Sequence, residues 1–244
     1  MINIKDPAKC CGCSACASIC AQGAITMQPD ALGFLYPVVD AKRCTNCGQC
    51  EKVCSFNEHY DRSMNLPEPD TYGARHKDTN EVMKSRSGAV FAAISNYILK
   101  QGGVIYGAGY KDHFRVCHKR ATTPEERDEL RGSKYVQSDM RGIYEQVKQD
   151  LKQGLTVLFS GTPCQTSAVR AYVGNKLSEN LVLIDVVCHG VPSPYIWQDL
   201  LKHIEQKHGG QITWVNFRDK ATYGWADHCE SYKICKNGLE NLVH

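Results

Sequence analysis

The pattern of apolar and polar positions changes near residue 70. Beyond it, short apolar runs alternate with longer amphipathic stretches, which predicts an α/β domain with a mixed or parallel sheet. We expect strands at residues 72–75, 104–110, 114–120, 156–159, 181–187 and 212–217, and helices at residues 87–100, from 123 onward, 143–153, 163–172 and 194–208. In the first of these helices, the apolar residues at helical spacing predict the buried face: Val90, Phe91, Ile94, Tyr97 and Ile98.

The first 56 residues form two similar halves, each with a cysteine-rich loop and a short helix. Apolar stretches at 25–27 and 34–39 indicate strands between the halves. The cysteines repeat one spacing, first as Cys10, Cys13, Cys16 and Cys20 and then as Cys44, Cys47, Cys50 and Cys54. This C-x2-C-x2-C-x3-C run is the bacterial ferredoxin spacing for a [4Fe-4S] cluster. We therefore predict an α+β ferredoxin-like domain with two [4Fe-4S] clusters at 1–58, a linker at 59–70, and the α/β domain at 71–244.

The ligand sets are expected to cross between the two halves. In two-cluster ferredoxins, the fourth cysteine of a run binds the other cluster. This rule assigns Cys10, Cys13, Cys16 and Cys54 to one centre and Cys44, Cys47, Cys50 and Cys20 to the other. Gly12 and Gly48 are expected where a side chain would crowd a cluster.

A zinc site and a disulfide framework are the alternative uses of these cysteines. Zinc sites favour two separated Cys-x2-4-Cys pairs, and a disulfide framework requires export to an oxidising compartment. Neither alternative accounts for one ferredoxin spacing that occurs twice in a short segment. Cys11, next to a predicted ligand, is expected to be a bystander.

Composition and charge narrow the class of protein further. The chain has 244 residues, 42% hydrophobic and 23% charged, which is typical of a soluble protein of two domains. Its net charge of +3, from 29 basic and 26 acidic residues without a block of either sign, favours neither nucleic acid nor an anionic membrane as a partner. No apolar run is long enough to span a bilayer and residues 1–9 lack signal-peptide features, so we expect a cytoplasmic protein.

Candidate binding loops lie between the predicted strands and helices of the second domain. In an open α/β sheet, ligands bind where such loops meet helix N-termini. Loops 85–88, 131–135, 160–165 and 188–190 are rich in small residues whose amides and hydroxyls suit a pyrophosphate, and Lys134 can supply a counter-charge. Taken singly, each loop is also ordinary turn chemistry, and Lys134 is also typical of a solvated lysine.

Two further residues are candidates for chemistry. Cys164 follows Pro163 at a predicted helix start, where a thiol pKa is lowered and the thiol becomes reactive, but a cysteine there also packs as a small apolar residue. His189 could donate a proton or hydrogen-bond a ring cofactor, and it could equally hold its loop in place.

Several motifs stand out together: the paired cysteine runs and the segments SRSG (85–88), GSKYVQS (132–138), GTPCQ (161–165), CHGVPS (188–193) and FRDK (217–220). With these motifs the chain resembles, over almost its whole length, the coenzyme F-420 hydrogenase/dehydrogenase β-subunit family. The resemblance implies FAD beside [4Fe-4S] clusters. The resemblance also implies which residues surround the FAD: Ser85, Ser87, Gly88, Ser133, Lys134, Tyr135, Ser138, Gly161, Thr162, Pro163 and Gln165. We call these residues the predicted FAD shell. Family members usually continue for over a hundred further residues, so we expect the flavin domain to be C-terminally truncated.

These features predict an iron–sulfur flavoprotein oxidoreductase. Clusters carry single electrons and most organic acceptors take two, so FAD is expected to link the clusters to a two-electron acceptor such as a deazaflavin coenzyme. The implied partners are a redox protein or hydrogenase/dehydrogenase subunit and a small-molecule acceptor. One alternative is an electron-transfer subunit with no substrate of its own. Another is a zinc-bound structural module.

Overall fold

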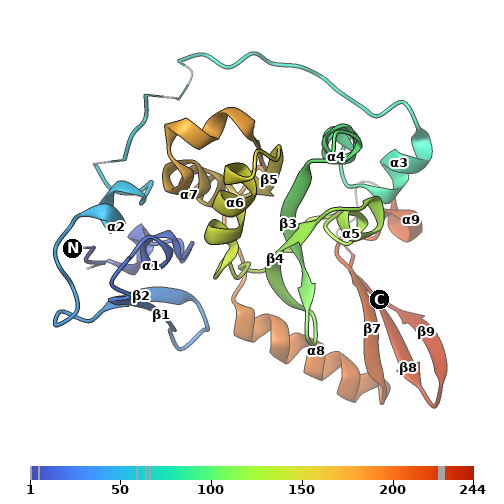
Figure 1. The fold of residues 1–244 in the computed structure, drawn as a ribbon. Helices are drawn as coiled ribbons and strands as arrows, with labels where there is room; N and C mark the ends of the chain where they lie inside the picture. The colour runs from blue at the N-terminus through green and yellow to red at the C-terminus, as the bar shows by residue number, and fades with distance from the viewer. Residues whose placement is uncertain (1, 5, 59, 64, 66, 225–228) are drawn as a thin grey trace.

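The computed structural model describes residues 2–4, 6–58, 60–63, 65, 67–224 and 229–244 (Figure 1). The cysteine-rich unit at the N-terminal end is built on the predicted pair of strands. β1 (Ile25–Pro29) and β2 (Leu35–Val39) form an antiparallel hairpin, and the 3-10 turn η1 (Pro7–Lys9) and the one-turn helices α1 (Ala15–Ser18) and α2 (Gln49–Lys52) complete the unit. Because these elements are short, most of the unit consists of loops, which include the cysteine loops.

The second part of the chain contains a mixed four-stranded sheet, as predicted. Its order is β4-β3-β5-β6, in which β3 (Val104–Lys111) pairs antiparallel with β4 (Arg115–Ala121). β3 also pairs parallel with β5 (Val157–Gly161), which in turn pairs parallel with β6 (Leu181–Asp185). The central strands are apolar because both faces of the sheet are covered by helices.

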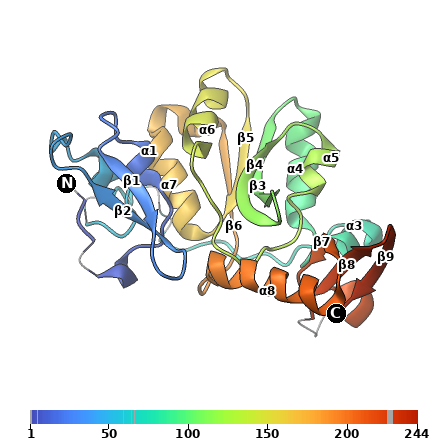
Figure 2. The same ribbon diagram turned by 90° about the horizontal axis from the view of Figure 1, so that it is seen from below.

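Different helices cover the two faces of this sheet (Figure 2). α6 (Ile143–Lys152) and α7 (Pro163–Val173) pack with the side of β3 and β5 that carries Tyr106 and Phe159, and the short η2 (Asn175–Asn180) follows α7. α4 (Val90–Lys100) and α5 (Pro124–Asp128) lie on the opposite face, where Ile98 meets Ile105 and Leu158. All of the predicted helices of the second part are present.

A three-stranded antiparallel sheet follows the central sheet, and only its first strand was predicted. β7 (Gln211–Asn216), β8 (Ser231–Lys236) and β9 (Leu239–Val243) form it in that order, with the short α9 (Lys220–Tyr223) after β7. α8 (Pro194–His208) joins the two sheets, because Trp197 and Leu201 on this helix pack with residues of both β4 and β7.

Two local predictions near residues 72–100 were wrong, and a third was right only in part. Residues 72–75 form no strand, and a short helix absent from the prediction, α3 (Thr79–Lys84), follows them. α4 begins at Val90 rather than 87, because Ala89 before it adopts a left-handed conformation with φ of 62°. Of the predicted stripe, Ile98 is buried and Phe91 and Ile94 pack partly buried against the sheet, whereas Val90 and Tyr97 are exposed. Ala92 and Ser95, which were not predicted, are buried because they meet Arg127 of α5, which donates to Ala92 O at 3.1 Å and to Ser95 Oγ.

The segment between the two parts crosses the molecule from α2 to α3 (Figure 1). Positions 59, 64 and 66 of the predicted linker lie outside the described residues. Near its start, Tyr60 is fixed to α7: its hydroxyl donates to Ser167 O at 3.0 Å and accepts from Arg170 at 2.8 Å. Across the parts of the chain that the structure describes, no helix has the length and apolar character needed to cross a membrane.

Candidate functional site

The two cysteine loops repeat the same unusual backbone. Two residues after the first cysteine of each run, Gly12 and Asn46 have φ of 64° and 53°. Four residues after it, Ser14 and Gly48 have φ of 68° and 74°. The left-handed region is favoured by glycine and tolerated by asparagine, so the repeat in sequence is also a repeat in conformation.

The two predicted glycines have different surroundings, and their closeness to a cluster stays a prediction. A Cβ on Gly12 would lie 2.5 Å from Nε2 of Gln137 and 2.7 Å from the carbonyl oxygen of Leu35, so protein atoms already fill that space. A Cβ on Gly48 would meet no protein atom closer than 3.8 Å. Gly12 is therefore required by its φ and by contacts with Gln137 of the second part and with Leu35 of its own unit, and Gly48 is required by its φ.

Cys54 lies with the cysteines of the first run. Burial is the main cause that raises the pKa of Cys10, Cys16 and Cys54, and the charges that these residues and Cys13 place on one another raise it further. Cys10, Cys13, Cys16 and Cys54 are the four cysteines that the ferredoxin rule assigns to the first cluster. That they bind one cluster stays a prediction.

The cysteines of the second predicted set, Cys44, Cys47, Cys50 and Cys20, differ in exposure and in their hydrogen bonds. Cys50 is buried and Cys47 is exposed. The sulfur of Cys50 accepts a hydrogen bond from the amide of Ile2, and the sulfur of Cys20 accepts one from Ala24, both at 3.3 Å. Cys44 donates weakly to Asn46 at 3.8 Å.

The donors around these sulfurs fit iron–sulfur clusters. Backbone amides also reach the first set, where Gly12 N lies 3.4 Å from the sulfur of Cys10. Amide hydrogen bonds stabilise thiolates, the form that binds iron, and they tune a cluster. Within the described residues, no three His, Cys, Asp or Glu side chains gather around one point as for a single metal ion. A cubane differs from such a site because each of its cysteines binds a separate iron corner.

Residues of the second part hold the first cysteine loop in place. The buried hydroxyl of Tyr144 on α6 donates to the carbonyl of Cys13 at 2.7 Å. The side chain of Gln137 donates to the carbonyl of Cys11 at 3.1 Å and accepts from the amide of Leu35 at 3.4 Å. Consequently the predicted ligand Cys13 lies directly against the α/β part.

Cys164, at the start of α7, lies beside this loop. Its sulfur is 3.1 Å from Thr162 Oγ1. A hydrogen bond from Cys11 is the largest cause that lowers the pKa of Cys164, to about 6. The pKa of Cys11 is raised because its thiol is the donor to both Cys13 and Cys164. The sulfur of Cys164 is thus partly exposed and in polar contact, and its reactivity stays a prediction.

The other predicted cofactor residues of this turn serve the start of α7. The side-chain oxygen of Gln165 accepts from the amide of Thr162 at 3.0 Å as part of a capping box, and Pro163 occupies the first turn. A Cβ on Gly161 would lie 2.9 Å from that oxygen, which explains the glycine. Sequence patterns of small residues cannot distinguish such a cap from a phosphate-binding turn.

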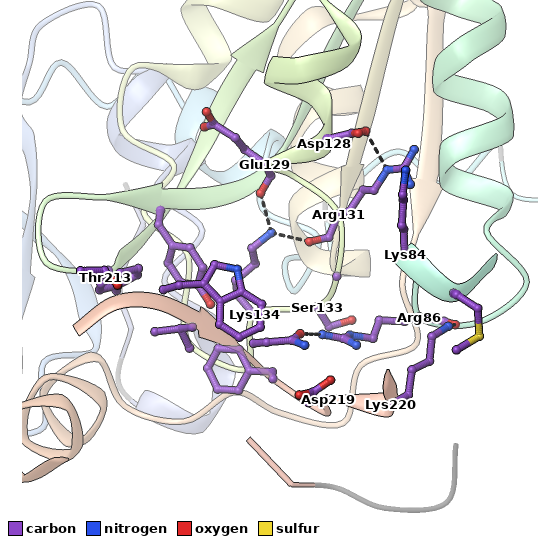
Figure 3. Close-up of a pocket in the computed structure, with 18 of the residues that line it drawn as sticks. Lys84, Arg86, Asp128, Glu129, Arg131, Ser133, Lys134, Thr213, Asp219 and Lys220 are labelled. Atoms are coloured by element: carbon purple, nitrogen blue, oxygen red, sulfur yellow. Dashed lines mark hydrogen bonds and ion pairs between the residues drawn. The ribbon is translucent and has the colours of Figure 1, made fainter. Parts of the chain in front are cut away.

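A cavity of about 760 Å³ lies between α3, α5 and β7 (Figure 3). Its size is within the range of small-molecule sites. Its lining combines cations and aromatic rings, among them Lys84, Arg86, Arg131, Lys134, Lys220, Tyr110, Phe114, Trp214 and Phe217. The acids in the lining are mostly engaged: Asp128 pairs with Arg131 at 2.7 Å, and Glu129 pairs with Lys119. Such a lining suits a ligand with aromatic and anionic parts.

Arg86 is the notable residue of this cavity; it lies in the predicted binding loop 85–88 but was not singled out there as a site residue. One of its terminal nitrogens donates to the carbonyl of Arg218 at 2.7 Å and the other to Asn216. Its Nε and the hydroxyl of neighbouring Ser85 are buried and have no hydrogen-bond partner among the described residues. Buried donors are normally satisfied, so a bound anion fits here. The SRSG segment could have signalled this residue.

Lys134 lines the same cavity but is not a free counter-charge. Its ammonium donates to the carbonyls of Glu129 at 3.0 Å and Arg131 at 2.9 Å. Burial lowers the pKa of Lys134 to about 7, with a smaller effect from the charge of Arg86. Lys134 therefore closes the turn after α5 and presents its remaining donor capacity to the cavity.

The other predicted residues are divided between several places. Ser133 also lines the large cavity, while Ser87 and Gly88 line a second one of about 450 Å³. Tyr135 packs edge-on against Phe217, with ring centroids 5.6 Å apart. The predicted shell is therefore not one pocket: residues 161–165 line neither of these two cavities.

Ser138 is linked to the turn at 160–165 through a histidine that was not predicted. His118 is buried, stacks on Phe159, and bridges Ser138 Oγ at 2.8 Å to Ser160 O at 3.1 Å. By contrast, the predicted catalytic residue His189 is exposed on the loop after β6 and lines neither of the two cavities.

Comparisons with known proteins support the sequence resemblance. Residues 9–57 match the family model of the 4Fe-4S dicluster domain. Residues 154–241 match the model of the C terminus of the coenzyme F420 hydrogenase/dehydrogenase β subunit. The F(420)H(2) dehydrogenase of Methanosarcina mazei has a subunit, designated F, that is 21% identical over 188 residues, which cover 73% of this chain and 53% of that protein.

One solved structure is also similar, that of the xenon-derivatised F420-reducing [NiFe] hydrogenase complex from Methanosarcina barkeri. The match has 18% identity and a TM-score of 0.45, and covers 73% of this chain and 62% of that one. The chain thus spans a little over half the length of these relatives. The chain thus resembles a 4Fe-4S dicluster domain at one end and, at the other, the C-terminal domain of the coenzyme F420 hydrogenase/dehydrogenase β subunit.

Proposed function

We propose that this chain is an iron–sulfur flavoprotein that transfers electrons between two [4Fe-4S] clusters, FAD and a two-electron acceptor such as a deazaflavin coenzyme. The observation that carries the proposal is the basic, aromatic cavity with the unpartnered donor of Arg86, in a chain that also contains a dicluster domain. A cavity of this chemistry fits a flavin dinucleotide because the ligand joins an aromatic ring system to a pyrophosphate.

Different residues of this chain would bind the clusters and the FAD. The clusters would be held by Cys10, Cys13, Cys16, Cys54, Cys44, Cys47, Cys50 and Cys20. Arg86 and Lys134 would bind the pyrophosphate, and Tyr110, Trp214 and Phe217 offer apolar surface to the rings. When bound, the clusters supply one-electron exchange and the flavin supplies both one- and two-electron exchange. Gln137 and Tyr144 keep the first cysteine loop against the α/β part.

A second candidate function is an electron-transfer subunit with no substrate of its own. The names of the relatives favour it, since one is a dehydrogenase subunit and the other belongs to a hydrogenase complex. In that case the partner would be a hydrogenase or dehydrogenase subunit, and the small-molecule acceptor would bind elsewhere. For both functions we propose a cytoplasmic location.

Anaerobic purification followed by cofactor analysis tests the proposal. We expect about eight irons and eight acid-labile sulfides per chain, and one FAD in the extract. Rapid oxidation of the reduced chain by a deazaflavin coenzyme supports the first function. Clusters without flavin, or flavin without small-molecule turnover, support the second. A colourless protein that contains zinc would refute both.

A further inference from the structure

Arg131 lines the large cavity, and the proposed function leaves it without a role. Its side chain is only 7% exposed. One terminal nitrogen, Nη2, pairs with Glu81 of α3, and Nε lies 2.7 Å from a carboxylate oxygen of Asp128 at the end of α5. The other terminal nitrogen, Nη1, is buried and has no hydrogen-bond partner among the described residues. Buried donors are normally satisfied, so an acceptor on a ligand fits at Nη1.

The ion pairs around Arg131 contain more cations than carboxylates. Glu81 pairs with both Arg131 and Lys84, the latter at 3.9 Å, and Asp128 pairs with both Arg131 and Arg127. Three cations in this cluster therefore share two carboxylates. Lys84 also lines the cavity, and its side chain is 65% exposed. Because its contact with Glu81 is long and exposed, its ammonium can turn to a ligand at little cost.

Arg131 and Arg86 belong to different parts of the cavity wall (Figure 3). Arg86 donates to Asn216 and to the carbonyl of Arg218, at the end of β7. Arg131 is instead tied to α3 and α5 through its carboxylate partners. The two guanidinium groups thus share no printed partner within the described residues, and each offers its own position for an anion.

We propose that Arg131 and Lys84 form a second oxyanion site in the cavity, for one phosphate or carboxylate group of a ligand other than FAD. The oxyanion would accept charge-assisted hydrogen bonds from Nη1 of Arg131 and from the ammonium of Lys84. That this ligand is the two-electron acceptor rests on the proposed function, in which Arg86 binds the pyrophosphate of FAD. The site itself does not depend on that function.

Equilibrium dialysis of the full, iron-loaded chain against labelled inorganic phosphate tests the proposal. We expect two bound phosphates per chain without FAD, at Arg86 and at Arg131, and one with saturating FAD. Arg131→Gln should weaken the phosphate that remains beside FAD roughly ten- to a hundredfold and leave FAD affinity unchanged. Lys84→Gln should weaken it about two- to fivefold. The matched control Lys202→Gln removes a lysine that is 68% exposed and pairs with Asp199 at 3.3 Å, and it should bind phosphate like the unmodified chain.

Three results would overturn the proposal. One is an Arg131→Gln chain with an unchanged urea midpoint that binds phosphate like the unmodified chain. Another is loss of all phosphate when FAD binds, or an FAD affinity that falls in Arg131→Gln as it does in Arg86→Ala, since either would assign Arg131 to the flavin. If Arg131→Gln does not fold, Lys84→Gln decides, and an unchanged phosphate affinity there is the third. A chain that binds no FAD would contradict the proposed function, and dialysis without flavin still tests the site.

Discussion

Replacing Gly12 with alanine tests how tightly the cysteine-rich unit is held against the rest of the chain. The added methyl group would lie 2.5 Å from Gln137 Nε2 and 2.7 Å from the carbonyl oxygen of Leu35. The matched control is Gly154→Ala after α6, where φ is also positive, at 81°, but no atom lies within 4 Å of the new methyl group. Both variants place an alanine at a positive φ, but only the alanine at position 12 would clash with neighbouring atoms.

The expected difference follows from these contacts. Both alanines adopt a left-handed conformation that costs about 1–2 kcal/mol. At position 12, overpacking adds about 1–3 kcal/mol. If the side chain of Gln137 moves away, it also loses its hydrogen bonds to Cys11 and Leu35, each worth about 0.5–1.5 kcal/mol. Gly12→Ala should therefore be less stable than Gly154→Ala by about 2–4 kcal/mol.

Urea unfolding followed by intrinsic fluorescence under anaerobic conditions measures this difference. With slopes of about 1–3 kcal/mol per molar urea, the midpoint of Gly12→Ala should lie about 1 M or more below that of the control. In a Gln137→Ala background the extra cost should shrink, because only the contact with the carbonyl of Leu35 remains. Equal midpoints for the two glycine variants would refute the close contact between the cysteine loop and the α/β part.

Three further predictions concern the cofactors and the histidine bridge. Cys13→Ala and Cys47→Ala should each lose about four irons per chain, measured after anaerobic reconstitution; loss of all iron in both would show that the centres assemble only together. Arg86→Ala should weaken FAD binding roughly ten- to a hundredfold, through loss of a charge-assisted contact of about 1.5–3 kcal/mol, and Lys134→Ala should have a similar or smaller effect in the same titration because its ammonium already binds two carbonyls. Burial lowers the pKa of His118 to about 4, so below about pH 6.5 only the unfolded chain takes up the proton. Stability should therefore be full above pH 6.5 and fall by up to about 1.4 kcal/mol per unit down to about pH 4, a dependence that His118→Asn should lack in urea titrations.

The elements that could be predicted from sequence are those that local pattern determines. Proline and the capping residue Ser193 mark the start of α8, and the alternation of apolar runs indicated the central strands. β8 and β9 were missed although Asn237-Gly238 between them is a strong hairpin signal, with both residues at positive φ. The burial of Ala92 on α4 could not be predicted, because Arg127 reaches it from a different helix.

Only the part of the candidate site that is defined by the spacing of residues in the sequence could be predicted. A repeated cysteine spacing specifies a cluster without knowledge of the fold. In contrast, the role of Arg86 depends on β7, which lies far along the chain, and the neighbours of Cys164 come from the first cysteine loop. Turns such as 161–165 have the same composition whether they cap a helix or bind a phosphate.

The topology of the two parts sets an order of assembly during synthesis. β1 and β2 are adjacent in sequence, so the cysteine-rich unit closes its hairpin with little loss of chain entropy. The central sheet must instead bring Val104 beside Val157, across α5 and α6. Since chains fold from the N-terminus as they are made, the cysteine loops emerge and pair while the residues that later hold them, Gln137 and Tyr144, are still untranslated. The first cysteine loop is therefore still open on the side of Gln137 and Tyr144 until the α/β part is made.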